Sequence, residues 1–155
     1  MHRILLSTIA VLLTFSSTSA TAASIAEQAE FLHLIRREKL DFVLPDAMRD
    51  NNVDMWIHVI RDGDPDPMQL HFGPVWGYII FTDRGGERIE RAIFGSGGHH
   101  DLFDEFGSDE IARALEGYNF GNVGGDVYNE ITQFVAERDP SRIAVNTSPW
   151  LAIAD

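Results

Sequence analysis

The sequence GYIIFTDRGGERIERAIFG, residues 77–95, contains two strand-like runs on either side of a short glycine-containing turn. Residues 78–82 and 88–94 have the β-branched and aromatic composition that is typical of strands. Gly85 and Gly86 supply the positive φ that a tight chain reversal requires. The stretch therefore predicts a β-hairpin, with its two strands paired antiparallel.

A long helix is predicted before the hairpin, over residues 24–51. Ser24 is a suitable amino-terminal cap, and Glu27 stands where a capping box requires an acidic partner. Pro45 has no amide for the helical hydrogen-bond ladder, which predicts a kink or a break near Leu44. At helical spacing, the residues expected on the apolar side are Ile25, Ala29, Leu32, Leu40, Val43 and Ala47.

Two further strands are expected, one before and one after the hairpin. Residues 53–60, VDMWIHVI, predict a strand in the interior of a sheet, and residues 142–146, RIAVN, predict a short buried strand. The proline-rich and glycine-rich stretches at 61–74 and 95–107 are expected to be connections without regular structure.

Two helices are predicted after the hairpin. Residues 108–117 form a short helical pattern capped by Ser108, and residues 126–138 form another capped by Asp126, which ends at Asp139-Pro140. The second helix is expected to present Val127, Ile131, Phe134 and Val135 on one face. The whole order of elements predicts an α/β domain with a mixed β-sheet flanked by helices.

Length and composition indicate a single globular domain preceded by an export signal. The chain has 155 residues, no cysteine and a formal net charge of -12, which disfavours nucleic acid and anionic membrane surfaces as partners and excludes thiol catalysis and cysteine-ligated metals. Residues 1–22 combine a basic start, an apolar run and the small residues Ala20-Thr21-Ala22, as a secretory signal peptide does. We therefore expect residues 23–155 to be exported, to a bacterial periplasm.

Polar clusters offer several candidate sites but no complete catalytic motif. The stretch HHDLFDE, residues 99–105, is interpreted either as a solvated acidic loop or as a metal site built from His99, His100 and Asp101. His58 is expected to be a hydrogen-bonded histidine at the sheet surface, and His71 to be more exposed. The sequence contains neither a phosphate-binding loop nor a nucleophile elbow.

Three stretches together resemble the amino-terminal domain of the creatinase, prolidase and Xaa-Pro aminopeptidase family, the pita-bread metallopeptidases. They are RREKLDFVLPDAMRDNNVDMWIHV (36–59), FTDRGGERIERAIFG (81–95) and ERDPSRIAVNTS (137–148), in the order in which the family has them. The resemblance implies a ribonuclease-H-like domain at residues 23–155. In the family, the catalytic residues lie in a later domain, where two aspartates, one histidine and two glutamates hold two divalent metal ions.

No position of this chain matches those ligands, so the resemblance implies no catalytic residue, no metal ligand and no cofactor in it. The chain is expected to be an inactive front part, or truncated form, of an Xaa-Pro aminopeptidase-like hydrolase. It would contribute subunit contacts and part of the active-site wall, with its own catalytic domain, a family homologue or a second copy as partner. His71, Phe72 and Trp76 are the residues expected at that wall or interface, on grounds of exposure and position. The alternative is a free-standing periplasmic interaction module that docks through the sheet edge or the Trp76 loop.

Overall fold

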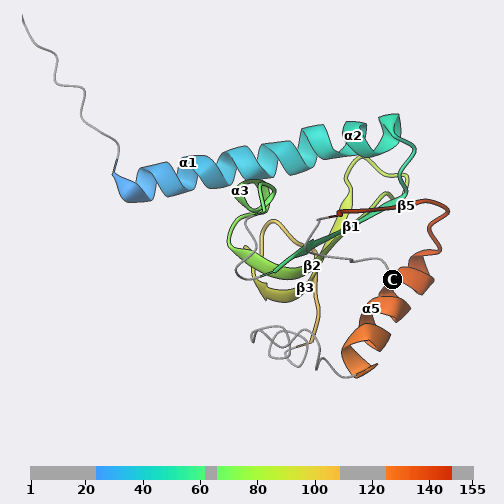
Figure 1. Cartoon of the computed structure of the whole chain (residues 1–155). Coiled ribbons are helices and arrows are strands. Elements are labelled where there is room, and N and C mark those ends of the chain that lie inside the picture. The colour runs from blue at the N-terminus through green and yellow to red at the C-terminus, as the bar shows by residue number, and fades with distance from the viewer. Residues whose placement is uncertain (1–23, 62–65, 109–124, 148–155) are drawn as a thin grey trace, which may run out of the picture.

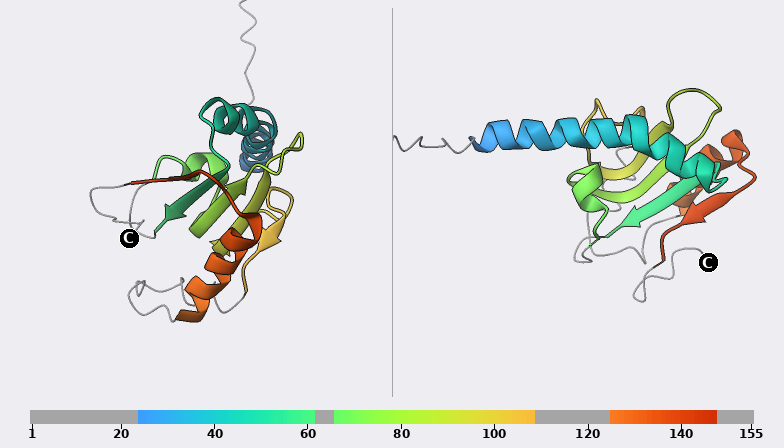
Figure 2. Two further views of the ribbon diagram at one scale, coloured as in Figure 1. Left: turned by 90° about the vertical axis from the view of Figure 1, so that its right-hand side faces the viewer. Right: turned by 90° about the horizontal axis from the view of Figure 1, so that it is seen from above.

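The computed structural model describes residues 24–61, 66–108 and 125–147. In these ranges one β-sheet lies between two helical layers, with α1 and α2 on one face and α5 on the other (Figures 1 and 2). The expected leader and nearly all of the helix expected at 108–117 lie outside the described residues.

The sheet is mixed, as the sequence predicts. Its five strands lie in the order β4-β3-β2-β1-β5. β2 pairs antiparallel with both β1 and β3. The edge strands pair in parallel with their neighbours, β4 with β3 and β5 with β1. The strands are β1 Met55–Ile60, β2 Val75–Thr82, β3 Glu90–Gly97, β4 Glu105–Phe106 and β5 Ile143–Val145.

The predicted hairpin is confirmed and is longer than the sequence indicates. Tyr78 pairs with Phe94 within the expected runs, but the ladder of β2 and β3 continues out to Val75 and Gly97. In the turn, Gly85 has a φ of 77°, a conformation that costs glycine little because it has no Cβ.

The first helical segment begins and is interrupted where the sequence predicts. The capping box is present, with the Glu27 amide donating to Ser24 Oγ and the Ser24 amide donating to Glu27 Oε2. α1 spans Ile25–Glu38, a π-helical turn η1 spans Lys39–Val43, and α2 spans Leu44–Asp50. The Leu44 amide bonds the carbonyl of Lys39, five residues back, so the wider turn falls directly before Pro45, which has no amide to give.

The predicted apolar side of this segment is largely wrong. Leu40 is buried, whereas the other five members are exposed: Ile25, Ala29, Leu32, Val43 and Ala47. Leu44 and Met48 join Leu40 in the core instead, at intervals of four residues. No residue of α1 is buried, because its first turns project past the sheet (Figures 1 and 2).

Alternate residues of the strands face the two helical layers, as a period of two requires. On the α2 face the core comprises Leu40, Leu44, Met48, Ile60, Phe72, Val75, Ile79, Phe81, Ile89, Ile93, Leu102 and Phe103. On the α5 face it comprises Met55, Ile80, Ala92, Phe94, Ile131 and Phe134. Both hydrophobic clusters therefore share the central strands.

The remaining predictions are partly confirmed. Helix α5, Gly125–Arg138, ends before Asp139 as expected, and β5 forms as predicted. β5 is not buried, however, since Ile143 and Val145 are exposed at the sheet edge. The two predicted connections also contain regular structure, namely the short helix α3, Gln69–Phe72, and the edge strand β4.

Candidate functional site

The three expected wall residues do not form one surface. Trp76 is half-buried and lines an open hollow of about 660 Å³ together with Arg36, Asp66, Pro67, Gln69, Leu70, Gly73 and Pro74. Leu70, on α3, is 74% exposed beside it. Of the expected residues, Trp76 alone lines this hollow.

Phe72 was expected to be exposed, and this prediction is wrong, because its side chain is fully buried. Its ring lies 5.8, 5.5 and 5.3 Å from the rings of Trp56, His58 and Phe81. His71 is half-buried, and its Nδ1 lies 3.1 Å from Nζ of Lys39 in η1. α3 thus turns these two neighbours into the core and toward the helical layer, respectively.

His58 forms a buried pair with Asp66, which the sequence did not indicate. Its Nε2 lies 2.9 Å from Asp66 Oδ2, and the other carboxylate oxygen accepts the Met68 amide. Burial lowers the pKa of His58, and the nearby carboxylate offsets only part of this effect. His58 Nδ1 is buried without a hydrogen-bond partner, and the rings of Trp56 and Phe72 pack on the imidazole. This contact therefore ties β1 to Asp66, ahead of α3.

The structure brings a histidine from α1 to the polar stretch after β3. His33 Nε2 lies 2.6 Å from Asp101 Oδ2, and the ring centroids of His33 and His99 lie 4.6 Å apart. One potential ligand atom from each of the three side chains lies within 4.8 Å of the other two. The hydrogen bond from His33 lowers the pKa of Asp101, so this carboxylate is ionised over a wider pH range than usual. Within the described residues, these three side chains form the group whose nitrogen and oxygen atoms lie close enough together to hold one metal ion.

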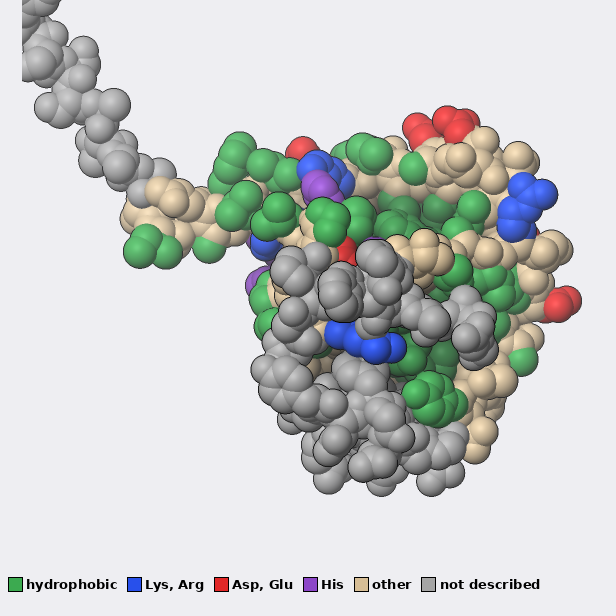
Figure 3. Space-filling model, viewed as in Figure 1, with side chains coloured by type: hydrophobic (Ala, Val, Ile, Leu, Met, Phe, Trp, Pro, Cys, Tyr) green, Lys and Arg blue, Asp and Glu red, His purple; other side chains and the backbone are tan. Residues whose placement is uncertain are grey.

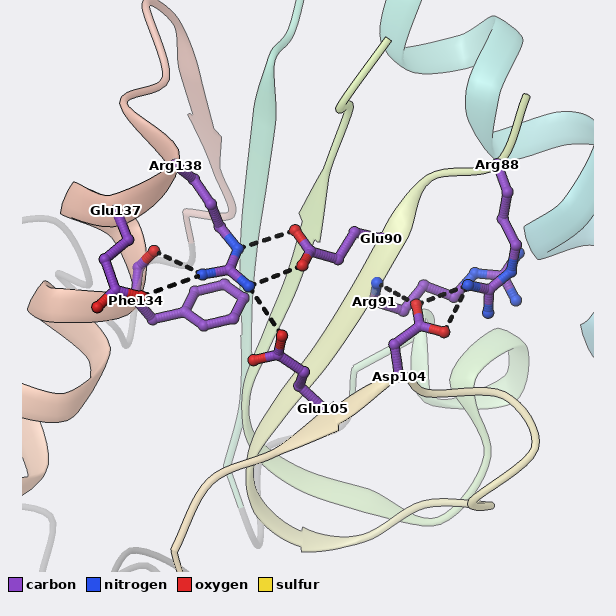
Figure 4. A network of polar contacts seen from close by, with 8 residues as sticks. All are labelled: Arg88, Glu90, Arg91, Asp104, Glu105, Phe134, Glu137 and Arg138. Atoms are coloured by element: carbon purple, nitrogen blue, oxygen red, sulfur yellow. Dashed lines mark hydrogen bonds and ion pairs between the residues drawn. The ribbon is translucent and has the colours of Figure 1, made fainter. Parts of the chain in front are cut away.

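The remaining members of the HHDLFDE stretch separate into other contacts. His100 packs on Phe106, with ring centroids 4.5 Å apart. Asp104 accepts two hydrogen bonds from Arg88 Nη1, at 2.5 and 2.6 Å, and one from the Arg91 amide (Figure 4). His100 and Asp104 thus do not share the His33 cluster.

A second polar network joins the edge strand to α5. Arg138 donates to both oxygens of Glu90, at 2.8 and 2.7 Å, and to Glu105 at 3.0 Å (Figure 4). Its guanidinium carbon lies 3.3 Å from the centroid of the Phe134 ring, a cation–π contact that covers one side of the charge. The bidentate geometry and the stacking make this arginine a clamp between α5, β3 and β4.

Comparison of the chain with protein-family models, with curated proteins and with solved structures found no match. Across the described ranges, none of the helices combines the length and the apolar character needed to cross a bilayer.

Proposed function

We propose that this chain is the non-catalytic amino-terminal domain, or a truncated form, of an exported Xaa-Pro aminopeptidase-like metallopeptidase of the creatinase and prolidase family. Its role is to provide subunit contacts and part of the wall of an active-site cleft. The three-part sequence resemblance supports this proposal, and a mixed sheet flanked by helices is compatible with the ribonuclease-H-like domain that the resemblance implies.

The observation that carries the proposal is the exposed apolar surface of α1 and η1. Phe31, Leu32 and Leu34 on α1 are exposed, as are Phe42 and Val43 on η1, and Phe31 retains 62% of its accessible surface. Hydrophobic side chains are visible along this projecting helix in Figure 3. Exposed apolar surface marks interaction sites when it is extensive, and fully burying one large apolar side chain contributes roughly 1.5–3 kcal/mol. The helix thus offers binding energy that the domain itself does not use.

Peptide hydrolysis by this family requires a different set of side chains. A two-metal site polarises the scissile carbonyl and generates hydroxide, which takes clustered carboxylates and imidazoles. The His33, His99 and Asp101 group supplies three ligand atoms, fewer than the five residues that the resemblance assigns to a later domain. We therefore propose that the described part of the chain contributes surface to a partner rather than the hydrolytic centre.

The alternative function is a free-standing periplasmic interaction module, and a specific observation favours it. β5 is an edge strand of three residues whose Ile143 and Val145 are exposed, and unpaired strand edges accept further strands. The hollow at Trp76 and exposed Leu70 provides a second docking place.

Binding measurements on two surface variants test the proposal against its alternative. The partner is the catalytic domain of an Xaa-Pro aminopeptidase-like homologue, immobilised for biolayer interferometry. Phe31→Ser/Leu34→Ser on α1 should weaken binding at least tenfold, whereas Ile143→Ser on β5 should leave it within twofold. If Ile143→Ser loses binding while Phe31→Ser/Leu34→Ser retains it, the edge-docking module is favoured instead.

A turnover assay addresses the chemistry separately. The purified full chain is incubated with Xaa-Pro dipeptides and Mn²⁺, Co²⁺ or Zn²⁺, and released amino acid is measured. We expect no release above the uncatalysed control. Sustained cleavage that a chelator abolishes would overturn the assignment as a non-catalytic domain.

A further inference from the structure

The cluster of His33, His99 and Asp101 combines residues that are far apart in the sequence. His33 lies on α1, whereas the other two lie in the connection between β3 and β4. We propose that His33, His99 and Asp101 bind one divalent transition-metal ion, with Zn²⁺ as the best match.

The ligand types fit this class of ion. Two imidazole nitrogens and one carboxylate oxygen are a common protein contribution to zinc sites that keep one coordination position open for water or another ligand. Imidazole also selects against Mg²⁺ and Ca²⁺, which prefer oxygen donors throughout. The cluster therefore predicts a preference for Zn²⁺ and its neighbours among the transition metals.

The distances require only small side-chain movements. Metal–ligand bonds of about 2.0–2.2 Å in a tetrahedral site place neighbouring ligand atoms roughly 3.3–3.6 Å apart. His33 Nε2 and Asp101 Oδ2 now lie 2.6 Å apart, sharing a hydrogen bond, so this pair must open by roughly 0.7–1.0 Å. All three ligand atoms already lie within 4.8 Å of one another. His99 and Asp101 are exposed, which leaves their side chains room to adjust.

The backbone on the loop side of the cluster is held by the fold. Gly98 has a φ of 87°, and a Cβ there would lie 3.3 Å from Ile93 and 3.4 Å from Phe103, so the residue before His99 favours glycine. The Leu102 amide donates to the His99 carbonyl at 2.9 Å, and Leu102 and Phe103 are buried. A turn anchored in the core thus presents both loop ligands toward α1.

Two features limit the expected affinity to the micromolar range. Metal-bound histidines usually donate their second nitrogen to an acceptor, but His33 Nδ1 is buried without a partner. The Arg36 guanidinium and the His99 ring both approach Gly73, where a Cβ would lie 3.9 Å from Arg36 Cζ and 3.8 Å from His99 Cδ2. The positive charge of Arg36 opposes the bound ion.

Isothermal titration with ZnCl₂ tests the site in the tag-free full chain after chelator dialysis. Wild type should bind one Zn²⁺ per chain with a micromolar Kd, and His33→Gln, His99→Gln and Asp101→Asn should each weaken binding at least tenfold. His100→Gln is the matched control, because it removes the adjacent exposed histidine that lies outside the cluster. Far-UV circular dichroism should show that all four variants keep the wild-type fold.

His33→Gln is the decisive variant, because only the three-dimensional arrangement brings this residue to the loop. No heat of Zn²⁺ binding at 100 micromolar ion, roughly a hundredfold above a micromolar Kd, would overturn the proposal. Binding that survives His33→Gln, or that His100→Gln weakens equally, would overturn it as well and would indicate a loop-only site. NMR of the imidazole nitrogens provides a second readout, in which Zn²⁺ should shift the signals of His33 and His99 and leave those of His100 unchanged.

This inference is independent of the proposed function. Partner binding through α1 is also measured for His99→Gln, which removes one proposed ligand and leaves the exposed Phe31 and Leu34 in place, so failure of the metal site leaves that experiment interpretable.

Discussion

Removing the Asp41 carboxylate should destabilise the protein, because it leaves a buried arginine without its charged partner. Arg91 lies on the interior strand β3, and its side chain is 1% exposed. Its Nη2 donates to Asp41 Oδ1 at 2.5 Å, and its Nη1 lies 3.4 Å from the Leu102 carbonyl. Burial lowers the pKa of Arg91, with Asp41 acting in the opposite direction. The ion pair therefore compensates a large desolvation cost.

The size of the effect follows from how far each partner is buried. Removing one member of a fully buried ion pair costs about 3–5 kcal/mol. Asp41, however, is 33% exposed, so water can reach the guanidinium once the carboxylate is gone. We expect Asp41→Ala to lower the free energy of unfolding by about 2–3 kcal/mol. Adding Arg91→Met should recover about 1–2 kcal/mol, because the buried charge is removed while the volume of the stem is retained.

Urea unfolding followed by tryptophan fluorescence at pH 7 measures these differences. Glu38→Ala, an exposed acidic residue three positions earlier, is the control and should stay within about 0.5 kcal/mol of wild type. The reasoning is refuted if Asp41→Ala is equally mild, or if the Asp41→Ala/Arg91→Met protein is less stable than Asp41→Ala alone.

Three further outcomes are expected from the same unfolding assay. Phe72→Ala should cost about 3–5 kcal/mol because it opens a cavity in a closed aromatic cluster, whereas Leu70→Ala, on the same helix but exposed, should cost under about 0.5 kcal/mol; equal costs would contradict the burial of the phenylalanine. Asn146→Ala should cost about 1–3 kcal/mol. The reason is that the Asn146 side-chain amide bonds both the backbone N–H and the C=O of Val59, at 2.9 and 3.0 Å. An unchanged free energy of unfolding would show that this contact does not stabilise the β5 edge. Burial holds the pKa of folded His58 below its ordinary value of 6.5, so the unfolded chain takes up the proton first as the pH falls. Stability should accordingly decrease from about pH 6.5 down toward the folded pKa. His58→Gln should lose this component, and urea midpoints at pH 7.5 and 5.0 that change equally in both proteins would disprove it.

Local patterns were sufficient for the elements whose residues contact their sequence neighbours. The hairpin was predicted from its turn glycines, and α5 was predicted from the spacing of Ile131 and Phe134, both of which are buried. β1 was predicted as an interior strand and lies between β2 and β5. In each case the local pattern and the tertiary environment favour the same structure.

The apolar stripe of the first helix failed for two physical reasons. A spacing of 100° per residue assumes one regular helix, whereas the π-helical turn at Lys39–Val43 shifts the phase of everything after it. The prediction also assumed that the whole helix packs on the sheet, but Ile25 is 87% exposed because the first turns extend beyond it. Neither the phase shift nor the projection is visible in a periodicity plot.

Two of the three residues of the proposed metal site were predictable. His99 and Asp101 were candidates because they stand two residues apart in a polar stretch. His33 was not, since no sequence spacing relates a helical histidine to a loop 66 residues later. The position of α1 along the sheet decides which of its residues meets Asp101 and His99. His100, which the sequence placed with the ligands, packs instead on Phe106.

Both the proposed partner surface and the proposed metal site include residues of α1, so both concern how this helix is held against the domain. No residue of the helix is fully buried, although His33, Ile35 and Arg36 are partly buried. Polar contacts tie it to the rest of the domain, such as His33 with Asp101 and Arg36 Nε with the Leu70 carbonyl at 3.0 Å. Exposed contacts of this kind contribute at most about 1 kcal/mol each, which is little for a helix of 14 residues. A partner that covers Phe31 and Leu34, or a metal ion that links His33 to the anchored turn, would each supply what the core does not. The first would act on the outer surface of the helix and the second on its contact with the loop, so each effect is measurable with its own variant.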